Sequence, residues 1–352
     1  MTPVITQVAT KFASKIKLIT KQFSINHTAT ISQEPIAATL VIPSIRFARS
    51  LREMNDSRRN SQPVANSKLV DTLNGVRLRT VTWGTRETHT KTPIVLVHGL
   101  ASNAMLWEGA ALALCALGHL VTAVDLRGHG LSDKPETGYD MQTVTQDLAG
   151  LLTEIQRDGF VKPIVCGQSW GGNVVVELAH KYAELVSGVV CVDGGFLELQ
   201  NHYPQWDDCA EALRPPTIVG TRIDDFQNYM QRSHSDWPET GINGAMACME
   251  HLPDGTLRPW LNLERHMMVL RGLWEHHPTH IYSEISVPVM FVPAEGPGGI
   301  FNETKRSAIE HATQLVPKVK VEWFSPADHD LHAQHPERFA QVVHAAITDG
   351  FF

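Results

Sequence analysis

The stretch that decides the fold is Gly167-Gln168-Ser169-Trp170-Gly171, which has the spacing G-x-S-x-G. An apolar run at 163–166 precedes it, and a helix-compatible stretch at 172–179 follows it. A serine between a strand and a helix lies on a sharp turn, where flanking glycines avoid a clash between a Cβ atom and the neighbouring chain. The turn exposes the hydroxyl at a helix N-terminus, where the dipole and free N–H groups favour negative charge. The stretch therefore predicts a nucleophile at Ser169.

The composition of the whole chain narrows the class of protein. The 352 residues carry a net charge of −7, which argues against nucleic acid as a partner. The chain has no apolar run of about 20 residues, so no integral membrane span is expected. The five cysteines are scattered and odd in number, which fits a reducing compartment and predicts a cytoplasmic protein. No cysteine or histidine cluster has zinc spacing, so neither a metal nor a cofactor is expected.

The N-terminal segment, residues 1–67, is predicted to lie outside the folded domain. Residues 1–33 contain four lysines and no acidic residue, and residues 54–68 have the Pro, Asn and Ser content of a linker. Apolar residues recur every three or four positions, as on one helix face. They are Val4, Val8, Phe12, Ile16, Ile19 and Phe23. Three interpretations remain open: an organelle-targeting peptide at 1–33, a weak membrane-surface contact through residues 4–23, and a loosely packed leader.

From residue 68 onward, short strand-like runs alternate with helix-compatible stretches. An alternating run at 76–83 has the pattern of an outer strand, and six apolar runs have that of buried parallel strands. The six are 94–97, 120–124, 164–166, 189–192, 289–292 and 319–324. The helical stretches are 103–117, 140–158, 171–185, 302–315 and 334–348. This order predicts an α/β fold with a mostly parallel sheet covered by helices on both faces.

The alternation stops between residues 197 and 284. This stretch is rich in tryptophan and proline and poor in strand-like runs, so it is predicted to be a mostly helical cap over the strand ends. The core then comprises residues 68–196 and 285–352. Met246, Met249, Met267, Met268 and the cap tryptophans suit a hydrophobic substrate, and they equally suit the cap's own core.

The chemistry requires a base, because a serine hydroxyl is a poor nucleophile at neutral pH. His329 stands five residues after the last strand-like run, on a predicted loop at the sheet edge that carries Ser169. An oxyanion hole requires two preset N–H donors. We expect these from the backbones of Trp170 and Leu100, and we expect His98, Gly99 and Trp170 to line the substrate pocket.

The acid that orients His329 is ambiguous from the residues alone. Asp193 stands at the end of the 189–192 run, and Glu295 follows the 289–292 run. Both ends are expected to approach the histidine loop. A structural role for Asp193, bonding backbone N–H groups of its loop, is a further possibility.

These features together resemble the α/β-hydrolase superfamily, in its lid-bearing branch, over about residues 72–350. Besides the serine elbow, the matching pieces are His98-Gly99, the run Asp125-Leu126-Arg127-Gly128-His129-Gly130-Leu131-Ser132, Val287-Pro288, and His329 seven residues before Pro336. The resemblance implies an eight-stranded α/β-hydrolase sheet with a helical cap insertion. The family's usual acid falls near Pro297 and is missing. One type of haloalkane dehalogenase places its acid after the sixth strand, and this similarity favours Asp193 over Glu295.

The resemblance and the serine together favour one chemistry. Dehalogenases and epoxide hydrolases of this branch carry aspartate at the elbow, whereas serine suits acyl transfer. We expect a serine hydrolase that cleaves a carboxylic ester or lactone in a small hydrophobic substrate through an acyl-enzyme on Ser169. Three other activities of the same residues stay open: C–C bond cleavage, amide or aminopeptidase cleavage, and perhydrolysis. A non-catalytic ligand-binding receptor is the remaining alternative, because fold alone does not define function.

Overall fold

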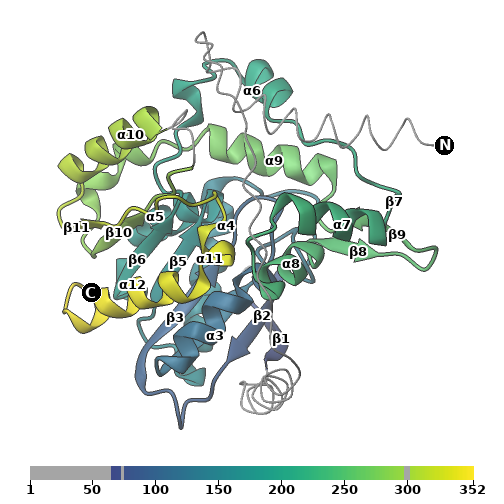
Figure 1. The fold of residues 1–352 in the computed structure, drawn as a ribbon. Coiled ribbons are helices and arrows are strands. Elements are labelled where there is room, and N and C mark those ends of the chain that lie inside the picture. The colour runs from purple at the N-terminus through teal and green to yellow at the C-terminus, as the bar shows by residue number, and fades with distance from the viewer. Residues whose placement is uncertain (1–64, 73–74, 297–301) are drawn as a thin grey trace, which may run out of the picture.

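The computed structural model describes residues 65–72, 75–296 and 302–352. Its centre is an eight-stranded sheet with the order β1-β2-β4-β3-β5-β6-β10-β11 (Figure 1). β1 and β2 run antiparallel to their neighbours, and the other strands pair in parallel. The strands are β1 (Asn66–Asp71), β2 (Arg77–Trp83), β3 (Lys91–Val97), β4 (His119–Val124), β5 (Ile164–Gln168), β6 (Gly188–Val192), β10 (Val289–Val292) and β11 (Val319–Val321). The predicted fold class is confirmed.

Helices cover both faces of the sheet. α3 and α12 share one hydrophobic core with it, and α4, α5 and α10 share the other. The helices are α3 (Glu108–Ala116), α4 (Met141–Ile155), α5 (Trp170–Lys181), α10 (Asn302–Leu315), α11 (Leu331–Gln334) and α12 (Pro336–Thr348). Short 3₁₀ turns are η1 (Ala104–Trp107), η2 (Gln156–Asp158), η3 (Ala183–Leu185), η4 (Leu199–Asn201), η5 (Pro278–His280) and η6 (Tyr282–Glu284).

The apolar runs form central strands because both of their faces are buried. In β3, Val95 and Val97 pack into the core beside α4 and α5, while Ile94 and Leu96 pack into the core beside α3 and α12. Alternate side chains of a strand point to opposite faces, so a strand between two helical layers must be apolar at every position. The carboxyl ends of β3, β5, β6 and β10 consequently meet at one edge, where the loops carry the predicted site.

The segment between β6 and β10 forms an insertion that contains both helices and strands. Its helices are α6 (Trp206–Ala212), α7 (Ile223–Ser233), α8 (Glu239–Met246) and α9 (Leu263–Trp274). Its strands β7 (Thr221–Arg222), β8 (Met249–His251) and β9 (Thr256–Pro259) form a separate antiparallel sheet. The sequence did not predict these strands, because two to four residues are too few to display a strand pattern.

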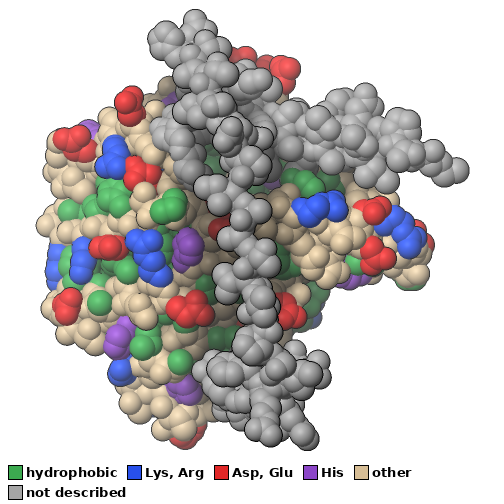
Figure 2. Space-filling view, viewed as in Figure 1, with side chains coloured by type: hydrophobic (Ala, Val, Ile, Leu, Met, Phe, Trp, Pro, Cys, Tyr) green, Lys and Arg blue, Asp and Glu red, His purple; other side chains and the backbone are tan. Residues whose placement is uncertain are grey.

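Of the predictions for the N-terminal segment, only the linker prediction reaches residues that the structure describes. β1 begins at Asn66, so the predicted linker is wrong over residues 66–68, where pairing with β2 overrides a polar sequence. The interpretations of residues 1–33 and 4–23 lie outside the described residues. None of the described helices has the length and apolarity needed to cross a bilayer. On the face shown in Figure 2, side chains of both charges are interspersed among the coloured residues.

Candidate active site

Ser169 lies on a sharp turn between β5 and α5. Its φ of 54° and ψ of −121° fall in a strained region for a residue with a side chain. A Cβ at Gly167 would lie 2.1 Å from the carbonyl oxygen of Gly171, and a Cβ at Gly171 would lie 2.4 Å from that of His98. Both positions therefore exclude any larger residue, which is the reason that the G-x-S-x-G spacing indicates this turn.

His329 and Asp193 are brought together at the same edge of the sheet. The Nδ1 atom of His329 lies 2.7 Å from Oδ2 of Asp193. The other carboxylate oxygen, Oδ1, accepts hydrogen bonds from the backbone N–H of Ala294 at 2.9 Å and from Nζ of Lys305 at 2.6 Å. Because both oxygens are held, the carboxylate has one orientation. It keeps the proton of a neutral His329 on Nδ1 and leaves Nε2 as the acceptor.

The charges around this pair set its protonation. Burial raises the pKa of Asp193, but the hydrogen bond and charge of His329, together with Lys305, outweigh burial and hold that pKa below its usual value. Burial lowers the pKa of His329, but Asp193 and, more weakly, Asp330 outweigh it and raise that pKa above its usual value. The pair is therefore arranged to stabilise an imidazolium, the form that a base takes after it accepts a proton.

Glu295, the alternative acid, lies elsewhere in the network. Its carboxylate pairs with Arg306, and the charge and hydrogen bond of this arginine lower its pKa. Its backbone N–H donates to the carbonyl of Phe324 at 2.8 Å, which fastens the loop after β10 to the chain beyond β11. The geometry thus gives the histidine contact to Asp193 and gives Glu295 a position in the loop scaffold.

The loop after β3 approaches the serine closely. A Cβ at Gly99 would lie 3.1 Å from Cβ of Ser169 and 2.3 Å from Oε1 of Gln168, so the backbone fits here only without a side chain. Leu100 follows and lines the same cavity as Ser169. Trp170 is the first residue of α5, so its N–H has no carbonyl one turn earlier to bond. The two predicted donors thus belong to the loop after β3 and to the first residue of α5.

Two buried histidines hold this loop. The ring of His98 accepts from the backbone N–H of Leu126 through Nε2 at 3.0 Å, so its Nδ1 carries the proton and donates to the carbonyl of Gly99 at 2.7 Å. His129 accepts from the N–H of Ala101 at 3.2 Å. Burial lowers the pKa of both histidines and keeps them neutral, as acceptors must be.

The cavity that contains the serine has a volume of about 290 Å³. The core contributes Ser169, His329, Asp330 and the loop after β3, and the insertion contributes a mostly apolar wall. The residues of that wall are Ile218, Phe226, Tyr229, Met230, His234, Trp237, Ala245, Cys248 and Met249. One side of the cavity thus carries the predicted catalytic residues, and the insertion forms the other side.

The three residues that were expected to line the substrate pocket lie outside the serine cavity. His98, Gly99 and Trp170 are not among the described residues that line this cavity. The indole of Trp170 is buried and stacks on His129 with ring centroids 5.4 Å apart, so it packs beneath the oxyanion loop. The wall comes instead from the insertion, whose side-chain directions a single sequence does not reveal.

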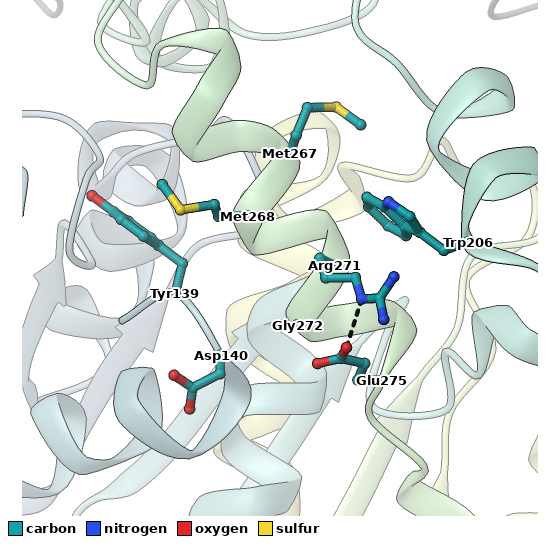
Figure 3. A pocket seen from close by; sticks show the side chains of 8 residues that line it. All are labelled: Tyr139, Asp140, Trp206, Met267, Met268, Arg271, Gly272 and Glu275. Carbon is teal, nitrogen blue, oxygen red and sulfur yellow. Dashed lines mark hydrogen bonds and ion pairs between the residues drawn. The ribbon is translucent and has the colours of Figure 1, made fainter. Parts of the chain in front are cut away.

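A larger cavity of about 420 Å³ lies against α9 and the turn before α4 (Figure 3). Met267 and Met268 line it, and Arg271 lies over the rings of Trp206 and Trp274 with centroid distances of 5.0 and 4.6 Å. Arg271 also pairs with Glu275 at 2.5 Å. Ser169 and His329 do not line this larger cavity. The cavity of about 290 Å³ that they do line is therefore the candidate active site.

One group of described residues has metal-ligand chemistry. Ligand atoms of Glu198, His277 and His280 all lie within 4.8 Å of one another. Glu198 already bonds His277 at 3.0 Å and Thr279 at 3.0 and 3.1 Å, and the two imidazole rings are stacked. The group also lies outside the serine cavity.

Three residues of the site were not predicted. Lys305 holds Asp193 from α10, and a lysine in a polar helix gives no signal of such a role. His129 belongs to a quoted motif, but its bond to Ala101 links two segments far apart in sequence. Asp330 lines the cavity next to His329, and its adjacency to the predicted base was the available signal.

A serine elbow, a histidine–carboxylate pair and a loop of backbone donors at the carboxyl edge of a mostly parallel sheet define the class of α/β hydrolases. The model of the alpha/beta hydrolase family matches residues 94–342, and the chain belongs to this family.

The proteins to which this chain is similar have names that refer to different substrates. The 2-(acetamidomethylene)succinate hydrolase of Mesorhizobium japonicum is 27% identical over 76% of this chain and 91% of its own length. Epoxide hydrolase A of Mycobacterium tuberculosis is 38% identical, but over 36% of this chain and 37% of its own. A crystal structure of E-2-(acetamidomethylene)succinate hydrolase superposes with a TM-score of 0.67 at 25% identity, covering 81% of this chain and all of that one.

Proposed function

We propose that this protein is a serine hydrolase that cleaves a carboxylic ester or lactone through an acyl-enzyme on Ser169. The observation that carries the proposal is the shared cavity of Ser169 and His329, with the imidazole bonded to Asp193 at 2.7 Å. A serine activated by an oriented imidazole is the standard arrangement for acyl transfer, whereas a ligand receptor does not require it.

The residues divide the reaction among them. Nε2 of His329 takes the proton of Ser169 as its Oγ attacks the acyl carbon, and Asp193 stabilises the imidazolium. The N–H groups of Leu100 and Trp170 hold the oxyanion. His329 then protonates the leaving alcohol, and water activated by the same Nε2 attacks the acyl-enzyme to release the acid.

The cavity wall supports an uncharged or cationic substrate over an anionic one. Of the described residues that line it, none is lysine or arginine, and Asp330 contributes a carboxylate. The M. japonicum relative is named for a succinate, a dicarboxylate whose charge would be repelled here. Since the elbow carries serine, the aspartyl-ester chemistry of epoxide hydrolases is not supported either, although epoxide hydrolases are among the similar proteins.

Amide cleavage is the second candidate, and the acetamido group in that relative's name is the observation that favours it. The two bonds are separated by a matched pair, 4-nitrophenyl acetate and 4-nitroacetanilide. These differ only in the leaving atom, so their ratio of kcat/KM reports the preferred bond directly.

The cellular location of the protein and the kind of molecule that it binds are also part of this proposal. All five cysteines are free, which supports a reducing compartment and therefore the cytoplasm. A small hydrophobic molecule is the partner that the apolar wall supports.

The first test is labelling with a fluorophosphonate probe, read by intact mass, on the wild type and on Ser169→Ala. We expect labelling of the wild type alone, followed by hydrolysis of short 4-nitrophenyl esters that the cavity can hold. If the wild type is not labelled, the serine is not activated and the ligand-binding alternative replaces the proposal.

A further inference from the structure

Asp330 is an acidic residue that lines the cavity of Ser169. It lines the cavity beside His329, yet its carboxylate makes no hydrogen bond or ion pair with the part of the chain that the structure describes. The neighbouring acids differ in this respect. Asp193 is bonded to His329 and Lys305, and Asp328 lies 4.0 Å from Nδ1 of His234.

The described residues that line the cavity offer Asp330 no lysine or arginine as a counter-charge. A carboxylate that leaves water needs compensating hydrogen bonds or an opposite charge. Burial raises the pKa of Asp330, although the residue is still partly exposed to solvent. Two imidazole rings line the same cavity, His234 and His329, and neither bonds to this carboxylate. A cationic group of a bound molecule can therefore supply the opposite charge that the cavity wall lacks.

The remaining wall indicates which partner fits. Three aromatic residues, Phe226, Tyr229 and Trp237, line the same cavity. The faces of aromatic rings attract cations, and an ammonium group gains most where it is also removed from water. A metal ion would require several oxygen or nitrogen ligands, whereas an ammonium group requires one counter-charge and apolar contacts.

We propose that Asp330 and the facing aromatic wall form a subsite for a cationic group, so that the preferred substrates are esters that carry an ammonium group. This inference rests on the proposed ester hydrolysis at Ser169 and adds the charge of the substrate to it. The ammonium group lies against Asp330 while the acyl carbon lies at Ser169, and the volume of about 290 Å³ limits the substrate to a small ester.

The test compares two esters of the same shape and different charge. Choline acetate carries a quaternary nitrogen where 3,3-dimethylbutyl acetate carries a carbon atom. For the wild type we expect kcat/KM to be about tenfold or more higher for the cationic ester, the size of one favourable cation contact. In Asp330→Asn, which keeps the shape, the ratio falls toward one.

A matched control is Asp328→Asn, because Asp328 is a nearby acid that does not line the cavity. This variant keeps the wild-type ratio. A ratio of one or below in the wild type, or a ratio that survives Asp330→Asn, overturns the subsite. If Asp330 acted only through His329, Asp330→Asn would lower kcat/KM equally for both esters, and the ratio between the two esters would stay at its wild-type value.

A binding measurement separates the subsite from the proposed reaction. Calorimetry on Ser169→Ala compares choline with 3,3-dimethylbutanol, and on Ser169→Ala/Asp330→Asn repeats the comparison. We expect choline to bind about tenfold more tightly in the first protein and equally in the second. This result stands even if Ser169 fails to react with the fluorophosphonate, whereas equal binding in the first protein ends the subsite proposal on its own.

Discussion

The imidazole of His329 is bonded through Nδ1 to Oδ2 of Asp193 at 2.7 Å, although the two residues are 136 positions apart. The topology explains the contact. β6 and β10 are parallel neighbours and β11 follows β10, so the loops after β6 and β11 emerge at the same edge of the sheet. The N–H of Ala294, just past β10, bonds the second oxygen of Asp193 and lies between the two loops.

The first prediction concerns this carboxylate. Asp193→Asn keeps the shape but lets the amide donate toward Nδ1, which favours the wrong tautomer of His329. We expect kcat with a 4-nitrophenyl ester to fall by about ten-thousandfold. The measurement is steady-state kinetics at pH 8, with circular dichroism to show that the fold is retained.

Glu295→Gln is its matched control, because Glu295 was the competing acid and bonds Arg306 instead of the histidine. We expect kcat within about threefold of the wild type, since an exposed ion pair contributes little. If Glu295→Gln inactivates the protein and Asp193→Asn does not, the two acids have been assigned in the wrong order.

The second prediction concerns pH. The base must be neutral to accept a proton, and Asp193 and Asp330 together raise the pKa of His329 above its usual value. We therefore expect kcat/KM to rise with pH along a limb whose midpoint lies above 6.5, the ordinary value for histidine. Removing one negative charge in Asp330→Asn lowers the pKa of His329 and shifts this limb to lower pH. A limb that stays in place in that variant shows that the Asp330 charge does not reach the histidine.

The sequence predicted the central sheet well, because buried parallel strands are apolar at every position. The runs 94–97, 120–124 and 289–292 lie within β3, β4 and β10. β1 was missed because an exposed edge strand is polar and its pairing with β2 defines it. Ser169 and His329 were placed by local patterns, the glycine spacing and the loop after the last strand.

The wall that the insertion contributes to the serine cavity could not be predicted from the sequence. Trp170 is adjacent to Ser169 in the chain, but its indole turns into the core and stacks on His129. Trp237 and Phe226, by contrast, are more than 50 positions from the serine and line its cavity. Which side of a helix in the insertion faces the cavity depends on tertiary packing, and no local pattern encodes it.

The third prediction concerns the oxyanion loop. His129 accepts from the N–H of Ala101, whose φ of 61° is unfavourable for a residue with a side chain. His129→Phe keeps the stacking on Trp170 but removes this acceptor, so the loop is held less firmly and Leu100 is positioned less well. We expect kcat to fall by about ten- to a hundredfold, somewhat less than for loss of an oxyanion donor, with KM little changed.

The control for this change is His280→Gln, an exposed histidine outside the cavity, which should leave both constants unchanged. A rise in KM with an unchanged kcat in His129→Phe would mean that the loop serves substrate binding and not the transition state.

The last prediction concerns stability in acid. His332 is buried with its ring 3.9 Å from that of Trp107, and its Nδ1 has no hydrogen-bond partner among the described residues. Burial lowers the pKa of His332 to about 3. Below pH 6.5 the unfolded chain binds a proton at this position and the folded protein does not, so the free energy of unfolding falls as the pH falls.

The slope from this one residue is about 1.4 kcal/mol per pH unit between roughly pH 6 and 4. His332→Phe removes the titrating group and keeps a ring against Trp107. We expect urea unfolding of the wild type to lose about 1.2 kcal/mol more than the variant does between pH 6 and 5. Other buried histidines, such as His98 and His129, titrate alike in both proteins and cancel in the difference. Equal losses in the two proteins would mean that His332 accepts a proton in the folded state, because the packing around it opens to water.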